Sequence, residues 1–278
     1  VDTNRFQAHW PADIHLVGKD ILRQHAVYWP IMLKACGVEM PRTVLAHGWW
    51  TMAGAKVSKS RGNAVDPVEL VKKYGVDALR YFLLNEVTIG NDGAFSEDLL
   101  AERYTTNLAN NLGNLWFRFA AMLEKYCDSK IPDIESGKIS LEINPDETYE
   151  NLWFRVEKFM LDFHPRAALM DIWGSIIIPL DKFIEDQQPW KMAKDPKRRE
   201  ELKQIMWILA EHLAHIGVLL LPFLPETAKK ILGRLKLPTE WVIKDAKEFA
   251  KAFLKPGMEV ERGDALFPKL DEEVEKVK

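Results

Sequence analysis

The first hundred residues alternate strand and helix signals, and this order constrains the fold more than any other feature. "DIHLVG", residues 13–18, is typical of a strand, and residues 19–37 carry apolar side chains at helical spacing. "RTVLAHG", residues 42–48, predicts a second strand. A strand–helix–strand unit implies that the two strands pair in parallel, in a sheet covered by helices. Pro30 lies inside the intervening helix and predicts a kink there.

The rest of the chain is dominated by helical periodicity. Asp66-Pro67-Val68-Glu69 has the form of a capped helix start, and that helix should stop at Gly75, before a second one, "VDALRYFLL". Strand signals nearly vanish after a polar, Gly-rich break at residues 88–98. Apolar residues then recur at three- and four-residue spacing over residues 99–126, 147–163, 164–186 and 197–221. We predict an α/β region over residues 1–97 and an all-α bundle over residues 98–278.

Composition narrows the class of protein. The chain has 278 residues, of which 47% are hydrophobic and 28% charged, as expected of globular domains. No apolar run is long enough to span a membrane. Cys36 and Cys127 are far apart and predict reduced thiols in an intracellular protein. The net charge of −3 gives no global basic field, so a polyanion would need a local patch. The densest candidate is residues 191–203, although such a run is also typical of a solvated helix face.

The stretch "AGAKVSKSRGNAVDP", residues 53–67, places two lysines and two serines within five residues. One interpretation is a solvated basic loop, since short Lys/Ser runs are common in turns. The other is a mobile phosphate clamp. The stretch follows the second strand and precedes a capped helix, at the end of a parallel sheet where α/β proteins bind nucleotides. Lysine ammonium groups there could follow a triphosphate as charge moves onto the leaving pyrophosphate.

"KVSKS" resembles the K-M-S-K-S signature of class I aminoacyl-tRNA synthetases, with Val57 in place of methionine. Four neighbouring stretches are similar, in the same order, to the methionyl-tRNA synthetase family: "WPADIHLVGKDILRQHAVYWPIML", "AHGWWTMAGAKVSKSRGNAVDP", "YGVDALRYFLL" and "QQPWKMAK". The resemblance implies that residues 1–97 are the C-terminal half of a Rossmann-like catalytic domain, with the lysine loop and a stem-contact region. It implies that residues 98–278 are an α-helical anticodon-binding domain with a C-terminal tail.

The resemblance also assigns roles to residues of the first region. Lys59 would neutralise the α-phosphate and pyrophosphate during adenylate formation, with Lys56, Ser58 and Ser60 shaping the loop and Val57 among the ATP-binding residues. Gly18 and Asp20 would meet the ribose of ATP, and His47 and Gly48 would lie under the adenine. His25 would line the methionine pocket with Trp29 nearby, while Gln24 departs from the aromatic residue that many relatives carry.

Residue patterns alone leave other interpretations open for these positions. His25 could be a core or surface histidine, and Trp29 could belong to the core. Asp20 could be the N-cap of the helix that follows "LVGK". "HIGV", residues 215–218, resembles part of the HIGH motif of class I synthetases. It lies inside a predicted apolar helix of the bundle, however, so we interpret it as coincidence.

Three residues of the helical region are assigned to the anticodon by the resemblance. Asn114 and Arg118 are four residues apart and share a helix face, so an amide and a guanidinium could reach one base. Trp190 offers an indole on which an unstacked base can stack. The resemblance implies that they read the CAU anticodon, above all its cytosine. Without it, Asn114 would be a surface residue and Trp190 a cap on the bundle.

The functional hypothesis is the C-terminal portion of a methionine–tRNA ligase, which uses ATP and Mg²⁺ and binds methionine and tRNA(Met). We expect no metal site in these residues, although zinc could occur in a missing N-terminal half, and no DNA or membrane partner. That half would cover apolar strand faces and an unpaired edge left exposed here. A cytoplasmic location is expected, with an organellar matrix as the alternative. The competing hypotheses are a tRNA-binding fragment without ligase activity and a class I synthetase for another amino acid.

Overall fold

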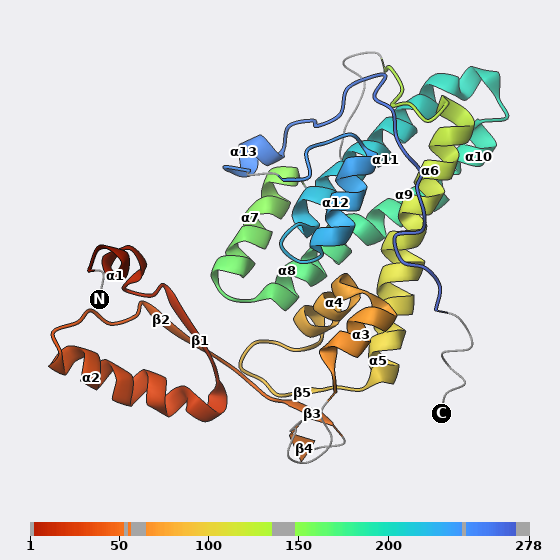
Figure 1. Cartoon of the computed structure of the whole chain (residues 1–278). Coiled ribbons are helices and arrows are strands. Elements are labelled where there is room, and N and C mark those ends of the chain that lie inside the picture. The colour runs from red at the N-terminus through yellow and green to blue at the C-terminus, as the bar shows by residue number, and fades with distance from the viewer. Residues whose placement is uncertain (1–2, 53–54, 57–64, 135–147, 241–242, 271–278) are drawn as a thin grey trace. The chain divides into compact units, whose positions relative to one another are not determined.

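The structure, a computed structural model, describes residues 3–52, 55–56, 65–134, 148–240 and 243–270. The chain divides into two compact units (Figure 1). The first consists of Val1–Asp66 with Glu86–Ser96, and the second of Pro67–Asn85 with Glu97–Lys278. The segment 67–85, grouped with the α/β region by sequence, therefore packs with the helices. The functional boundary near Glu97 stays a prediction.

The first unit contains the predicted strand–helix–strand arrangement. Strands β1 (Ile14–Gly18) and β2 (Thr43–His47) pair in parallel, with Ile14 opposite Thr43 and Gly18 opposite His47. The parallel pairing is confirmed. Helix α1 (Thr3–His9) precedes β1, and a three-stranded sheet is formed by β3 (Trp50–Met52), β4 (Ala55–Lys56) and β5 (Gly93–Ala94) in the order β4-β3-β5.

The helical connection between β1 and β2 is irregular. It starts as a 3-10 turn at Lys19–Ile21, widens to a π-helical stretch at Gln24–Tyr28 and becomes regular in α2 (Trp29–Ala35). Pro30 has no N–H to donate, and its ring crowds the carbonyl one turn earlier. A wider turn ahead of Pro30 relieves that crowding. The connection ends at Gly37, whose φ of +67° suits glycine.

The second unit is a helical bundle built around one long apolar helix, α11 (Arg199–Leu220). Every residue from 209 to 220 is buried, and α11 packs against α6, α9, α10 and α12. A helix that is apolar on all sides must be central. Within the described residues, the α-helices of this unit are α3 (Pro67–Tyr74), α4 (Val76–Glu86), α5 (Glu97–Arg103), α6 (Asn114–Cys127), α7 (Tyr149–Leu161), α8 (Pro165–Ile172), α9 (Ile178–Gln187), α10 (Pro189–Met192), α11, α12 (Pro225–Arg234) and α13 (Ala246–Phe249). Two π-helical stretches, Tyr104–Gly113 and Trp173–Ile177, continue α5 into α6 and α8 into α9.

Helix α4 is tied to the turn between α11 and α12. The buried Asp77 carboxylate accepts the Thr227 backbone N–H at 2.6 Å and so caps the start of α12. Arg80 donates to the carbonyl oxygens of Phe223 at 2.8 Å and Pro222 at 2.9 Å. These bonds explain why α3 and α4 belong to the helical unit.

"HIGV" lies within α11, and His215 is completely buried there. The interpretation of this stretch as a bundle segment is confirmed. The chain after α12 runs back over the bundle, where Glu211 in α11 accepts the backbone N–H groups of Phe253 at 2.5 Å and Leu254 at 3.1 Å. A buried carboxylate thus holds the tail. Over the described ranges, no helix combines the length and apolar character needed to cross a bilayer.

Candidate functional site

The carboxyl ends of β1 and β2 bring two short segments together. Because Gly18 and His47 are register partners, the residues that follow each strand emerge at the same edge. "GKD", residues 18–20, thereby lies beside "HGW", residues 47–49. The His47 ring nitrogen Nδ1 is 2.8 Å from the Gly48 carbonyl oxygen.

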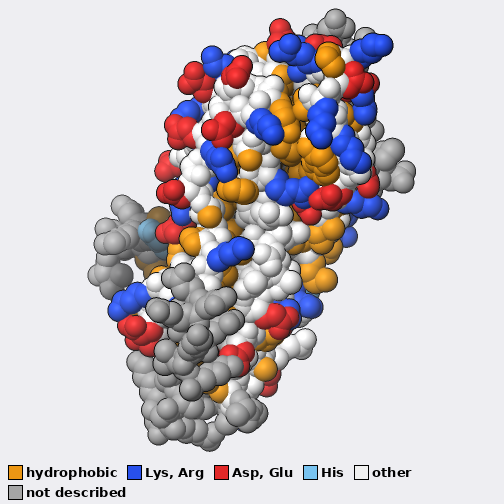
Figure 2. Space-filling view, turned by 90° about the vertical axis from the view of Figure 1, so that its right-hand side faces the viewer, with side chains coloured by type: hydrophobic (Ala, Val, Ile, Leu, Met, Phe, Trp, Pro, Cys, Tyr) orange, Lys and Arg blue, Asp and Glu red, His pale blue; other side chains and the backbone are white. Residues whose placement is uncertain are grey.

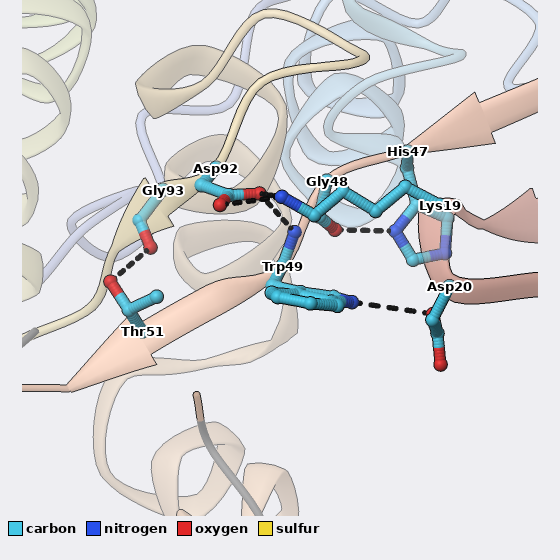
Figure 3. A network of polar contacts seen from close by, with 8 residues as sticks. All are labelled: Lys19, Asp20, His47, Gly48, Trp49, Thr51, Asp92 and Gly93. Atoms are coloured by element: carbon cyan, nitrogen blue, oxygen red, sulfur yellow. Dashed lines mark hydrogen bonds and ion pairs between the residues drawn. The ribbon is translucent and has the colours of Figure 1, made fainter. Parts of the chain in front are cut away.

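A polar network links these two segments to the loop before β5 (Figure 3). Lys19 Nζ lies 2.5 Å and 2.7 Å from the two carboxylate oxygens of Asp92, and 4.2 Å from the centre of the Trp49 ring. Asp92 also accepts the Trp49 backbone N–H at 2.9 Å. The hydrogen bond from Lys19, followed by that from Trp49, lowers the pKa of the Asp92 carboxyl. Asp92 therefore stays ionised and fixes the edge of the site.

Asp20 is not a helix N-cap. Gly18 occupies the cap position of the 3-10 turn and makes no side-chain cap bond, so the capping interpretation of Asp20 is wrong. Its carboxylate instead accepts the indole N–H of Trp49 at 3.3 Å, across the gap between the two strand ends (Figure 3). A carboxylate in that position can accept paired hydroxyl groups.

Two glycines leave room at this edge for the loop before β5 and for the Asp20 carboxylate. A Cβ at Gly48 would lie 2.0 Å from the carbonyl oxygen of Asn91, and one at Gly18 would lie 2.6 Å from a carboxylate oxygen of Asp20. Side chains at either position would displace the loop or the carboxylate. The predicted residues Gly18, Asp20, His47 and Gly48 are thus brought together.

A cleft of about 720 Å³ opens between β1 and the helical connection. His25, Trp29 and Gln24 line it, so the three residues discussed for the methionine pocket share one space. The His25 ring is 6.1 Å from the His15 ring, and Trp29 makes an edge contact with Trp10 at 6.2 Å. His25 and Trp29 are half-buried rather than core residues.

Most of the lysine loop lies outside the described residues. Val57, Ser58, Lys59 and Ser60 fall there, so their predicted roles stay predictions. The structure describes the backbone of Lys56, which pairs with Thr51 in the β3–β4 ladder. The chain is described again from residue 65, just before α3.

The second unit holds the residues predicted for the anticodon. Arg118 donates to Asp181 at 2.8 Å and to Glu185 at 2.6 Å, and its guanidinium carbon lies 6.0 Å from the centre of the Trp190 ring. Two carboxylates one turn apart on α9 thus orient the guanidinium beside a half-buried indole. Asn114 is exposed one helical turn before Arg118.

Several site residues were missed by the sequence analysis. Asp92 lies in a Gly-rich break with no motif around it, and its partner Lys19 is 73 positions away. Asp181 and Glu185 have the i, i+4 spacing of neighbours on a helix, a signal that could have placed them on one face. Nothing in the spacing pointed to Arg118 as their partner.

Two family models match different parts of the chain and together cover most of it. Residues 1–120 match the family described as "tRNA synthetases class I (M)", and residues 153–277 match "Anticodon binding domain of methionyl tRNA ligase". The chain belongs to the methionyl-tRNA synthetase family. The predicted architecture, a Rossmann-like part followed by a helical anticodon domain, is thereby confirmed.

Relatives within the methionyl-tRNA synthetase family agree with this assignment. The chain is 44% identical over 273 residues to methionine–tRNA ligase of Caldanaerobacter subterraneus subsp. tengcongensis, covering 98% of the chain and 42% of the relative. It is 42% identical over 272 residues to that of Bacillus subtilis, covering 97% and 40%. The Mycobacterium tuberculosis methionyl-tRNA synthetase bound by methionyl-adenylate superimposes with a TM-score of 0.85 at 34% identity, over 96% of this chain and 52% of that one. The chain therefore spans about half the length of its relatives or less.

Proposed function

We propose that this chain is the part of a methionine–tRNA ligase that contributes one side of the active site and the anticodon reader. In the first step a carboxylate oxygen of methionine bonds to the α-phosphorus of ATP and pyrophosphate leaves. In the second, a hydroxyl of the terminal tRNA ribose attacks the carbonyl carbon, and AMP leaves. Membership of the family and the names of the relatives support this reaction.

The observation that carries the proposal is the convergence of "GKD" and "HGW" at the ends of two parallel strands. Asp20 would accept the ribose hydroxyls of ATP, with Gly18 leaving room, and His47 and Gly48 would lie under the adenine. Lys59 would neutralise charge on the α-phosphate and the departing pyrophosphate, since a donor aimed at developing charge lowers the barrier. Lys56, Ser58 and Ser60 would shape that loop, with Val57 at its centre.

We propose that Mg²⁺ arrives with ATP, as part of the nucleotide substrate. Among the described residues, no three His, Cys, Asp or Glu side chains gather into a group that could hold a metal ion. A cytoplasmic location remains a prediction.

Methionine would occupy the cleft lined by His25 and Trp29. Two apolar residues that line this cleft are largely exposed, Leu16 by 64% and Met32 by 58%. Exposed apolar side chains along one cleft favour a partner that covers them. The portion of the relatives that this chain does not span would supply it and close the cleft, with Gln24 on its wall.

The anticodon of tRNA(Met) would be read by the helical unit. Trp190 would stack on the unpaired cytosine of CAU, and Arg118 and Asn114 would bond its edge. The fixed guanidinium beside the indole supports this arrangement, because an orientated donor loses less freedom on binding.

Binding of the chain to an anticodon stem-loop tests the second half of the proposal. We expect at least about tenfold tighter binding to the CAU loop than to one whose cytosine is replaced, at fixed salt. Trp190→Ala should abolish that preference. Equal binding of both loops by the unaltered chain would refute the anticodon assignment.

Catalysis is tested by methionine-dependent exchange of pyrophosphate into ATP, with the remaining portion of the relatives supplied. Cysteine and the branched aliphatic amino acids serve as competitors for the amino acid. Exchange with one of these instead of methionine would indicate another class I specificity. Anticodon preference without any exchange would favour a tRNA-binding fragment.

A further inference from the structure

The basic segment 191–203 holds cations that the proposed anticodon contacts do not account for. It begins in α10, directly after Trp190, continues through a 3-10 turn at Pro196–Arg198, and enters α11. Figure 2 shows Lys and Arg side chains gathered around an apolar patch on the upper part of the viewed face. Some cations of the segment form ion pairs with nearby carboxylates, and the others do not.

Two cations of the segment are already neutralised within α11 and the turn before it. Arg198 pairs with Glu201 at 2.7 Å, and Lys203 pairs with Glu200 at 2.7 Å. These pairs are typical of a solvated helix face. They account for part of the charge run as ordinary surface.

The other four cations are different. Lys191, Lys194, Lys197 and Arg199 are exposed, and no carboxylate among the described residues lies within 4.0 Å of their charged groups. The acidic residue between them, Asp195, accepts the backbone N–H of Lys197 at 3.0 Å and caps the turn. Its carboxylate is occupied in ordering the backbone, so the four charges remain available.

These unpaired cations extend from the proposed base-reading surface to the end of α6. Lys191 and Lys194 follow Trp190, whose ring lies beside Arg118. At the other end, Arg199 is close enough to Cys127, the last residue of α6, to act on its thiol electrostatically. Unpaired cations beside a stacking indole match the phosphate and base of one polynucleotide strand.

We propose that Lys191, Lys194, Lys197 and Arg199 form a phosphate-binding strip for the RNA backbone that flanks the base stacked on Trp190. This inference rests on the proposed function for the identity of the RNA. The strip supplies affinity without sequence preference, whereas Arg118, Asn114 and Trp190 supply the preference.

The test compares two double variants with the same loss of charge. The slope of log K against log salt is negative, and each lost phosphate contact makes it shallower by about 0.7 to 0.9. K191Q/K194Q should therefore make the slope for the CAU stem-loop shallower by about 1.5 and weaken binding at 0.1 M salt at least about tenfold. The matched variant R198Q/K203Q removes the paired cations and should change the slope by much less.

The preference for cytosine distinguishes the role of the phosphate-binding strip from that of the residues proposed to read the base. In K191Q/K194Q both stem-loops should lose affinity equally, so the ratio of their binding constants stays constant. Equal slope changes in both double variants, no change in either, or a changed ratio in K191Q/K194Q would overturn the strip. If the unaltered chain shows no cytosine preference while the slopes differ as predicted, the anticodon assignment fails and the strip stands.

Discussion

Acidification should destabilise the helical unit through two buried histidines. His212 and His215 lie on consecutive turns of α11, His215 between the rings of Tyr149 at 3.6 Å and Phe253 at 4.4 Å. Burial lowers the pKa of His212 to about 4 and that of His215 to about 3. Burial also raises the pKa of Glu211 to about 6.

The sign of the effect follows from which state binds more protons. Between pH 7.5 and 5 the unfolded histidines bind protons near their usual pKa of about 6.5, while the folded ones do not. Each therefore costs about 2 kcal/mol of stability at pH 5. Glu211 acts in the opposite direction, because at pH 5 its carboxylate binds a proton more readily in the folded state than in the unfolded state. This raises the free energy of unfolding at pH 5 by about 1 kcal/mol. The net loss should be about 3 kcal/mol.

Urea unfolding followed by far-ultraviolet circular dichroism at pH 7.5 and 5.0 measures this loss. In His212→Gln the loss should shrink by about 2 kcal/mol. His164, which is exposed, offers the matched control, and His164→Gln should leave the loss unchanged.

The arrangement around His215 defines the refuting result. Its two ring nitrogens lie 2.8 Å and 2.9 Å from the carbonyl oxygens of Glu211 and Phe249, and only a protonated ring can donate to both. Stability that is equal or higher at pH 5 would mean that these acceptors outweigh desolvation. His215 would then be a buried cation beside Glu211.

Three substitutions test other parts of the molecule. Lys59→Ala, with the rest of the ligase supplied, should slow methionine-dependent pyrophosphate exchange by about 3 to 4 kcal/mol of barrier while stem-loop affinity is kept; unchanged exchange would contradict the phosphate clamp. Asp77→Ala leaves the Thr227 N–H without its buried acceptor and should lower the free energy of unfolding by about 1 to 3 kcal/mol in urea titration; an unchanged midpoint would argue against the cap. Gly48→Ala should lower thermal stability, because its Cβ would meet the Asn91 carbonyl, whereas Gly174→Ala meets nothing within 4 Å and should not.

Local signals in the sequence predicted the elements well. The alternation of "DIHLVG" and "RTVLAHG" with an amphipathic segment predicted β1 and β2 and their parallel pairing. Apolar spacing predicted the helical segments that became α5 to α9 and α11, but not α12 or α13. Gly37 and Gly75 marked helix ends, both with positive φ. The π-helical stretch before Pro30 was not predicted, because proline signals an irregular turn without specifying its form.

Contacts between distant residues could not be predicted. Arg80 bonds a carbonyl 143 positions away, so periodicity could identify α4 as a helix but not assign it to the helical unit. Likewise the pairing of Lys19 with Asp92 ties a loop that looked only polar to the edge of the proposed nucleotide site. The lysine loop itself was found through its motif, and its side chains lie outside the described residues.

The division of the chain into units affects how the protein can be dissected. The backbone passes between the units three times, after residues 66, 85 and 96. No continuous stretch of the gene therefore encodes either unit alone. A fragment starting at Glu97 would lack α3 and α4 and leave the carbonyls of Pro222 and Phe223 without their arginine. After a single proteolytic cut at any of the three crossings, at least one of the two fragments would still contain residues of both units.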